Sequence, residues 1–359
     1  MSTLDTIHHK PRILTGDTPT GSLHLGHWVG SVKRRVELQD SHDCYFIIAN
    51  MHAYTTRLAK SEEIKRDSIG IVRDYLAMGI DPEKATIFLQ SEIPAIAELT
   101  FLFAMLLPFN RVMRNPTLKT EIELKGLGET YSFGFPLYAV GQTADILAFR
   151  PVGVPVGEDQ VPHLELTREV ARRFNQIFCK VDEHIEDDDH VKGGGVFPVP
   201  RADVGEVGRL AGIDGVNKMS KSLNNAIFIG DSAKEVEKKV KKIFTGRQSA
   251  TEPGDTTNVL FQYVRIFIKD QARVKELEAK YAAGADIGDG HVKLEVAAAI
   301  NELLEPMRER RAKYEGRDDL VLDILKAGCA RANVVAEATL ERVKHHANLV
   351  AWPRALSYV

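Results

Sequence analysis

Several features that mark other classes of protein are scarce or missing in this sequence. Its 359 residues include three cysteines, Cys44, Cys179 and Cys329, which are far apart and form no CxxC pair. A disulfide framework or a zinc site is therefore not expected, and a reducing cytoplasm fits. The sequence has no run of about 18 apolar residues, so we do not expect a membrane span. It also lacks a basic start followed by an apolar core, so we do not expect a secretory signal.

An excess of basic charge is also missing. The net charge is −3, and 44% hydrophobic with 27% charged residues is typical of a soluble globular protein. Only local basic runs could indicate a nucleic-acid partner, and most such runs are solvated faces. Two runs in the C-terminal part qualify: Lys234, Lys238, Lys239, Lys241 and Lys242, and then Arg308, Arg310, Arg311 and Lys313.

Strands and helices are predicted to alternate in the first part of the chain. Short apolar runs predict strands at 12–16, 44–51 and 86–91, and helical spacing predicts helices at 31–39 and 61–78. This alternation is typical of a parallel α/β sheet. Beyond about residue 230 only helical patterns remain. They include the apolar stripe Val236, Val240, Ile243 and Phe244, and the segments 263–269, 292–304, 320–325 and 334–345.

The stretch GDTPTGSLHLGH, residues 16–27, carries two glycines at the spacing of a Walker-type phosphate loop. The lysine and hydroxyl residue that such a loop needs do not follow. Instead, His24 and His27 stand where a helix begins, and the unpaired N–H groups there suit phosphate. Gly26 lacks a Cβ, which would let a flat base or ribose lie on the backbone. The alternative is two surface histidines near a turn.

A second motif, KMSKS, occupies residues 218–222 in a predicted loop. Lys218 and Lys221, with hydroxyls between and after them, can surround a polyphosphate, although a charged surface loop is the alternative. HxGH early and KMSKS late are together the signature pair of class I aminoacyl-tRNA synthetases. We therefore expect the two lysines to replace the missing phosphate lysine, delivered by a distant loop.

Longer stretches resemble bacterial tryptophanyl-tRNA synthetases, from about residue 12 to 230 and more loosely beyond. They include ILTGDTPTGSLHLGHWVGSVK, RNPTLKTEI, GQTADILAF, VPVGEDQVPHLELTREVARRFN and GIDGVNKMSKSLNN. The resemblance implies a Rossmann-type nucleotide-binding domain at 1–228, with a helical insertion near 95–150. It implies an all-helical anticodon-binding domain at 229–359, and a homodimer. Some members hold an iron–sulfur cluster with four cysteines, which three scattered cysteines cannot supply.

The resemblance also implies a tryptophan site. Asp145 stands where the family's carboxylate accepts a hydrogen bond from the indole N–H, and a buried carboxylate without that partner is costly. His52, Gln142, Val154 and Val156 match positions near the substrate. A capping or ion-pairing role for Asp145 and a core role for the valines stay open, as does pocket packing around Leu14 and Gln142, where some members carry other residues.

For ATP, the resemblance implies catalytic roles for His24, His27, Lys218 and Lys221, and close approach of the nucleotide at Gly157. Asp159 would accept hydrogen bonds from ribose hydroxyls. Mg²⁺ is expected to bind through the phosphates, with no protein ligand identified. The full set of expected ATP-binding residues is Thr18, Pro19, Thr20, Gly26, His27, Gly157, Glu158, Asp159, Gln160, Leu210, Lys218, Met219, Ser220, Lys221 and Ser222.

The implied reaction has two steps and needs no protein nucleophile. The tryptophan carboxylate attacks the α-phosphorus of ATP and pyrophosphate leaves; the terminal adenosine of tRNA(Trp) then attacks the adenylate through its 2′-OH. Three rivals remain: a tyrosyl-tRNA synthetase, a small nucleotidyltransferase that needs no tRNA, and a catalytically silent paralogue. An acidic metal site in the tract EDDDHVKGGG, residues 186–195, is a further alternative to a solvated loop.

Overall fold

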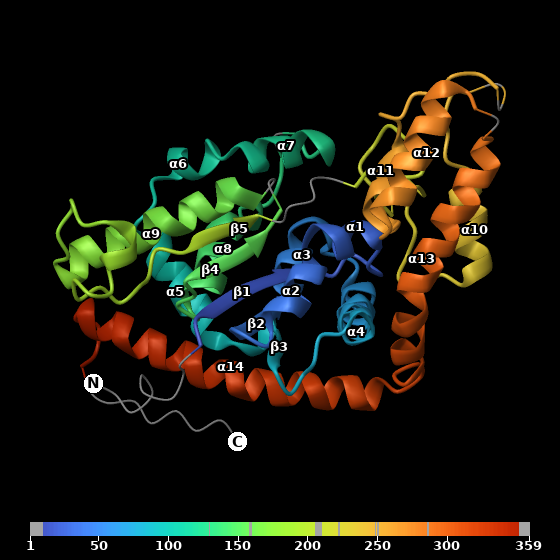
Figure 1. Cartoon of the computed structure of the whole chain (residues 1–359). Helices are drawn as coiled ribbons and strands as arrows, with labels where there is room; N and C mark the ends of the chain where they lie inside the picture. The colour runs from blue at the N-terminus through green and yellow to red at the C-terminus, as the bar shows by residue number, and fades with distance from the viewer. Residues whose placement is uncertain are drawn as a thin grey trace.

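A five-stranded parallel sheet forms the centre of the structure (Figure 1). The computed structural model describes residues 10–128, 130–157, 160–204, 210–221, 223–247, 249, 251–285 and 287–351. The strands lie in the order β3-β2-β1-β4-β5. They are β1 (Arg12–Asp17), β2 (Asp43–Ile48), β3 (Ala85–Leu89), β4 (Gly153–Val156) and β5 (Arg201–Val204). The α/β, Rossmann-type fold class expected from the sequence is thereby confirmed.

Helices cover both faces of this sheet and continue after it. The first part of the chain contains α1 (Leu25–His27), η2 (Trp28–Val32), α2 (Lys33–Leu38), α3 (Asn50–Arg57), α4 (Ser61–Met78), η3 (Gln90–Glu92), α5 (Pro94–Ala104), α6 (Phe109–Met113), α7 (Pro116–Leu124), α8 (Gly134–Leu147), α9 (Val161–Cys179) and η5 (Asp187–Asp189). The C-terminal helices are α10 (Ala233–Lys241), α11 (Val259–Phe267), α12 (Gln271–Ala283), α13 (Asp289–Ala312) and α14 (Asp318–His346).

The strand order reverses between β1 and β4, and this position determines where a ligand site can form. β1 pairs with β2 on one side and with β4 on the other, and all of these pairs are parallel. In open parallel sheets, ligands bind beyond the carboxyl ends of the strands at such a reversal. The loop that begins at Asp17 and the loop that begins after Val156 both leave the sheet there.

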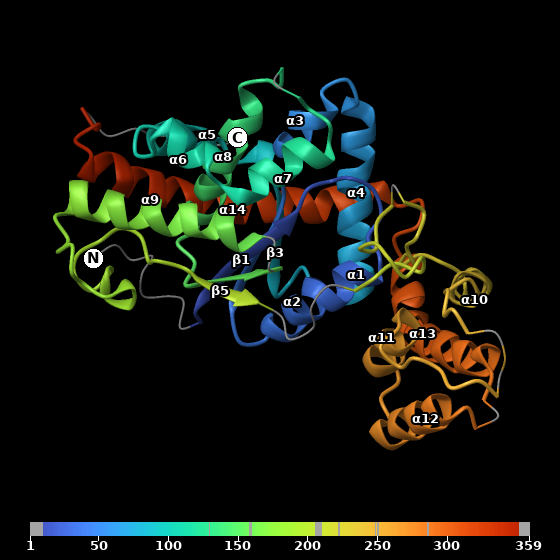
Figure 2. The ribbon, with the colours of Figure 1, turned by 90° about the horizontal axis from the view of Figure 1, so that it is seen from above.

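Successive side chains of a strand point to opposite faces, so the sheet separates two hydrophobic cores. Ile13 belongs to one core and its neighbour Leu14 to the other. The first core contains the fully buried α4 residues Ile71 and Tyr75, and it continues into α10–α13. The C-terminal helices therefore share apolar contacts with the sheet domain; Figure 2 shows α10–α13 at one end of the molecule.

The last helix returns to the sheet. The segments 320–325 and 334–345, predicted as separate helices, are parts of the single helix α14, which runs past β3 and α5 (Figure 1). A Cβ at Gly328 would lie 1.8 Å from the carbonyl oxygen of Ile87, so the close approach of α14 to β3 requires glycine. The predicted domain boundary at 228/229 stays a prediction.

The second basic run contains contacts within the protein and is not simply a solvated face. In α13, Arg310 donates to the carbonyl oxygen of Ala77 at 2.7 Å, and Arg311 lies 3.2 Å from the carboxylate of Asp74. Both acceptors belong to α4, so these arginines fasten the C-terminal helices to the sheet domain. The apolar stripe expected at 236–244 is shorter than predicted, because α10 ends at Lys241 and Phe244 is 73% exposed.

A buried ion pair joins the end of β1 to α2. Arg35, which is 2% exposed, donates to Asp17 at 2.7 Å and to the hydroxyl of Tyr75 at 2.7 Å. The Tyr75 hydroxyl in turn donates to Asp17. Burial alone would raise the pKa of Asp17, but the Arg35 guanidinium and these hydrogen bonds lower it to about 2.

We expect Arg35→Met to destabilise the fold by about 3–5 kcal/mol at neutral pH, because Asp17 would remain buried without its cation. The folded pKa of Asp17 is below its unfolded value, so its contribution is present above about pH 4 and is lost as the pH falls toward 2. Urea unfolding at pH 7 and pH 3 measures this. The neighbouring Arg34→Met removes only half-exposed pairs with Asp203 and Glu37 and should cost less than about 1 kcal/mol; equal effects of the two substitutions would contradict the account.

Across the described part of the chain, no helix combines the length and apolar character that crossing a membrane requires.

Candidate functional site

A cavity of about 870 Å³ opens at the carboxyl ends of β1 and β4. Among the residues predicted from the sequence, those that line it are Thr18, Thr20, His24, Gly26, His27, His52, Gln142, Asp145, Val154, Val156, Gly157, Gln160, Leu210, Lys218 and Met219. Pro19, Ser220 and Lys221 belong to the segments beside it. Glu158, Asp159 and Ser222 lie outside the described residues. The fold thus brings most of the predicted set into one space.

The two motif segments meet through backbone hydrogen bonds. Leu25 donates to the carbonyl of Ile227 at 2.9 Å, and Ile229 donates to the carbonyl of Leu23 at 3.1 Å. The chain that follows KMSKS is therefore paired with the chain that contains HLGH. This short pairing explains how motifs far apart in the sequence reach the same cavity.

Both motif histidines are neutral near physiological pH. Burial lowers the pKa of His24 to about 2 and that of His27 to about 4. The Nδ1 atom of His27 accepts from the backbone N–H of His24 at 3.1 Å, so the His27 proton lies on Nε2. Nδ1 of His24 is buried without a hydrogen-bond partner among the described residues. The site thus offers imidazole hydrogen bonds without fixed charge, as the sequence suggested.

Gly26 makes room for the neighbouring imidazole. A Cβ at this position would lie 2.9 Å from Nδ1 of His24. The space that we expected for a flat base or ribose is therefore taken in part by the His24 ring, while Gly26 still lines the cavity.

Lys221 extends toward the glycine loop, where its Nζ lies 3.5 Å from the Thr20 hydroxyl. Burial lowers its pKa to about 8, opposed by the carboxylates of Asp67, Asp17 and Asp74. The ammonium group is thus still mostly protonated at pH 7 and is only partly hydrated. Such a cation interacts more strongly with phosphate than a solvated one does.

A buried asparagine organises the KMSKS loop, and sequence reasoning did not single it out. Asn225, 1% exposed, accepts from the Ser220 N–H at 2.7 Å and donates to the Lys218 carbonyl at 3.2 Å and to Asp214 at 2.9 Å. It stands three residues after the end of the motif, in SLNN, but only the folded loop reveals these three partners.

The glycine loop also has an arginine partner that the sequence did not indicate. Arg57, at the end of α3, donates to the carbonyl oxygen of Pro19 at 2.5 Å and to Asp67 at 2.9 Å. Its side chain lines the cavity. Because Arg57 comes from a helix beyond β2, no local sequence signal could have placed it against the loop.

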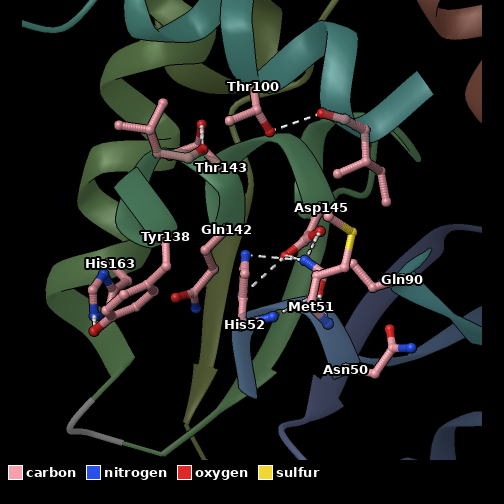
Figure 3. A network of polar contacts seen from close by, with 12 residues as sticks. Asn50, Met51, His52, Gln90, Thr100, Tyr138, Gln142, Thr143, Asp145 and His163 are labelled. Atoms are coloured by element: carbon pink, nitrogen blue, oxygen red, sulfur yellow. Dashed lines mark hydrogen bonds and ion pairs between the residues drawn. The ribbon is translucent and has the colours of Figure 1, made fainter. Parts of the chain in front are cut away.

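Asp145 also lines this cavity, in the half that His52 and Gln142 border, and Figure 3 shows its carboxylate beside Gln90 and His52. Asp145 stands in the last turn of helix α8 and is 3% exposed; because an aspartate caps the N-terminus of a helix, the capping alternative is excluded. Burial raises its pKa to about 7, although two hydrogen bonds from Gln90, at 2.8 and 3.0 Å, act to lower it. His52 lies 3.6 Å away, but burial lowers its pKa to about 4, so a charged pair does not form at neutral pH.

Apolar side chains complete this half of the cavity. Leu14 and Val154 are each 2% exposed and belong to the core, yet both line the cavity, and so does Val156. The core and pocket alternatives for the two valines are therefore compatible. Gln142 connects this half to the GEDQ segment, residues 157–160, because its amide nitrogen lies 3.5 Å from the side-chain oxygen of Gln160.

The acidic tract at 186–195 is held by arginines. Asp187 accepts from Arg168 at 2.6 Å and from Arg172 at 2.7 Å, and these bonds hold the pKa of its carboxyl well below the usual range. Nowhere in the described residues do three or more potential metal ligands gather. The tract thus has a structural role in these contacts.

Comparison with known proteins agrees with this geometry. A family model described as tRNA synthetases class I (W and Y) matches residues 6–305. The tryptophan–tRNA ligase of Lactococcus lactis is 43% identical over 343 residues, 93% of this chain and 97% of the relative. The tryptophan–tRNA ligase of Treponema pallidum is 42% identical over 347 residues, which cover 95% of this chain and 98% of the relative.

A solved structure supports the same relationship. The crystal structure of tryptophanyl-tRNA synthetase from Campylobacter jejuni, complexed with ADP and tryptophan, superimposes with a TM-score of 0.79 at 30% identity. The match covers 94% of this chain and 100% of that chain. The chain therefore belongs to the class I tRNA synthetases for tryptophan and tyrosine, and within that family to the tryptophan–tRNA ligases.

Proposed function

We propose that this cavity is where the chain binds ATP and tryptophan and joins them as tryptophanyl-adenylate. The observation that carries the proposal is the arrangement of the cavity itself. Residues of HLGH and KMSKS and the buried carboxylate of Asp145 all line the same cavity. A polyphosphate and an indole can therefore be held within one continuous space.

Adenylate formation depends on positioning and charge stabilisation. The tryptophan carboxylate attacks the α-phosphorus of ATP, and the bond to pyrophosphate breaks. His27 donates through Nε2 toward the phosphate and ribose side, and His24 contributes a second imidazole beside it. Lys218 and Lys221 contact the β- and γ-phosphates and stabilise the leaving group. No side chain forms a covalent bond to substrate.

Other predicted residues fix the nucleotide and the indole. Thr18, Pro19 and Thr20 lie beside the phosphates, while Leu210 and Met219 cover the base. The GEDQ segment (Gly157, Glu158, Asp159 and Gln160) and Ser222 of KMSKS complete the proposed nucleotide site. His52, Gln142, Val154 and Val156 surround the indole that Asp145 recognises.

Mg²⁺ is proposed to bind through ATP. Mg²⁺ usually keeps several waters and is bound through substrate phosphates, so phosphate oxygens and water would hold it here. When bound, it would neutralise charge on the β- and γ-phosphates. The protein's part is to hold those phosphates with the two lysines.

The second step transfers tryptophan to tRNA(Trp), whose terminal 2′-OH attacks the adenylate carbonyl. Charging of tRNA in translation places the enzyme in the cytoplasm. The test is aminoacylation of tRNA(Trp) and tRNA(Tyr) transcripts with labelled tryptophan. Charging of tRNA(Trp) alone is expected; the absence of charging despite adenylate formation would favour the nucleotidyltransferase alternative, and the absence of both steps the silent paralogue.

We further propose that the active form is a homodimer, formed through α5 and α6. Three large apolar side chains in this segment are exposed: Phe101 of α5 by 72%, Met105 just after α5 by 66%, and Phe109 at the start of α6 by 61%. Exposed apolar side chains gathered in one segment are typical of a protein–protein contact. Because a closed two-fold interface uses the same patch twice, a second copy of the chain can cover it.

The double variant Phe101→Glu, Met105→Glu should shift the protein from dimer to monomer in sedimentation velocity, because two charges on each copy would meet in the interface. Phe244→Glu is the matched control, since Phe244 is equally exposed but lies beyond α10. A monomeric wild type, or a double variant that remains dimeric, would refute this face as the interface.

A further inference from the structure

A buried glutamine connects the carboxylate of Asp145 to the start of helix α3. Gln90 follows β3 directly and is 3% exposed. Its side chain contacts Asp145 and His52 together (Figure 3). The motifs of the sequence assign it no role, yet it is the strongest polar neighbour of the carboxylate that we assign to indole recognition.

The orientation of the Gln90 amide follows from its backbone partners. Oε1 accepts from the N–H groups of Met51 at 3.1 Å and His52 at 3.2 Å. These groups belong to the first turn of α3, whose N–H groups have no intrahelical acceptor, and the N-cap Ala49 has no side chain that could provide one. Because a backbone N–H can only donate, the oxygen must face α3, and the NH₂ group must face the cavity.

That orientation determines the state of His52. The NH₂ group of Gln90 lies 3.0 Å from Nε2 of His52 and 2.8 and 3.0 Å from the two oxygens of Asp145. An amide NH₂ only donates, so Nε2 of His52 must accept and the ring proton lies on Nδ1. Nδ1 is 3.6 Å from Oδ2 of Asp145, which is beyond hydrogen-bond distance, so Gln90 and not His52 supplies the hydrogen bonds to this carboxylate.

We propose that Gln90 is a positioning residue for tryptophan. Its amide holds Asp145 as an ionised acceptor and His52 as the Nδ1–H tautomer, so that the carboxylate presents a lone pair to the indole N–H. This inference rests on the proposed binding of the indole at Asp145. It assigns selectivity to a unit of three side chains from η3, α3 and α8.

The unit has a distinctive pH dependence. Burial raises the pKa of Asp145 to about 7, and the Gln90 hydrogen bonds oppose this rise. Affinity for tryptophan should thus increase as the pH rises through 7, where the carboxylate ionises. Without Gln90 the ionisation moves to higher pH. The other titratable groups that face this half of the cavity are His52 on α3, Glu121 and Lys125 on α7, Tyr138 on α8 and His163 on α9. Apart from His52, which contacts Gln90 itself and whose pKa burial lowers to about 4, their titration is common to variant and wild type and cancels in a ratio of the two.

The test is Gln90→Met, which keeps the length of the side chain and removes its donor. KM for tryptophan in pyrophosphate exchange should rise about 10- to 100-fold at pH 7, the effect of losing a hydrogen bond to a buried charge. The ratio to wild type should fall to a few-fold by about pH 9, as Asp145 ionises unaided. KM for ATP should stay unchanged. A role limited to capping α3 predicts a ratio that does not vary with pH.

The matched control is Gln39→Met. Gln39 is also buried and also bonds through both ends of its amide, to Gly79 and Asp81, but outside the cavity. Its tryptophan KM should equal that of wild type at every pH. An unchanged KM in Gln90→Met, or a raised KM with a constant ratio, would overturn the proposal.

A measurement that needs no variant is ¹⁵N NMR of the wild-type protein with labelled histidine. A His52 ring that carries its proton on Nε2 would also overturn the proposal. Failure of the indole assignment itself is recognised separately, by a wild-type tryptophan KM in Asp145→Ala.

Discussion

Replacing Lys221 by alanine should slow adenylate formation by about 10²–10³-fold and leave tryptophan affinity nearly unchanged, because the loss of one preorganised charge donor typically costs that much. Lys221 reaches the glycine loop at Thr20, and its partly buried ammonium group has few waters to give up when phosphate arrives. The indole half of the cavity lies apart from this contact. Single-turnover formation of adenylate, with tryptophan binding measured by equilibrium dialysis, gives both quantities.

Lys65→Ala is the control for this prediction. Lys65 is an exposed lysine on α4 outside the cavity lining, so its removal changes net charge equally without touching the site. Adenylate formation should then be slowed only in Lys221→Ala, and tryptophan affinity should stay near wild type in both variants. Wild-type adenylate formation in that variant would remove Lys221 from the mechanism.

Replacing Asp145 by alanine should chiefly damage recognition of the indole. A site built to satisfy a substrate donor rejects analogues without it by roughly 10⁴–10⁵, because its buried acceptor would stay unpaired. Wild type should therefore discriminate strongly against β-(3-benzothienyl)alanine, in which sulfur replaces the indole N–H. In Asp145→Ala the tryptophan kcat/KM should fall by at least about 10²-fold, while the analogue loses little. Discrimination between the two substrates should fall by about the same factor.

Asp187→Ala serves as control, since Asp187 bonds Arg168 and Arg172 in the tract outside the cavity. It should keep the full preference for tryptophan. If Asp145→Ala still discriminated against the sulfur analogue, another acceptor would have to bind the indole N–H.

The sequence predicted the parts of this molecule that depend on local pattern. The strands β1, β2 and β3 and the helix α4 follow from apolar periodicity, although the second strand was predicted too long because Asn50 already begins α3. β4 and β5 were not predicted. Each has four residues, and Pro155 in one and the charged Arg201 and Asp203 in the other obscure the alternation that marks a strand.

The candidate site shows the same division. Its motif residues were identified because their spacing is distinctive, and the fold brings them to one cavity. The residues that hold them in place were not identified. Gln90 and Arg57 act through partners in other elements, and Asn225 acts through partners that only the folded loop brings together. Burial also changes chemistry in a way that sequence does not display: the pKa of Asp145 rises to about 7 only because α8 places it inside the protein.

The most direct test of the account is amino-acid-dependent exchange of labelled pyrophosphate into ATP without tRNA, with tryptophan and tyrosine in parallel. We predict exchange with tryptophan and none above background with tyrosine, since the latter lacks an indole N–H for Asp145. Exchange with tyrosine instead would contradict the assigned specificity, and no exchange with either amino acid would contradict the roles proposed for His24, His27, Lys218 and Lys221.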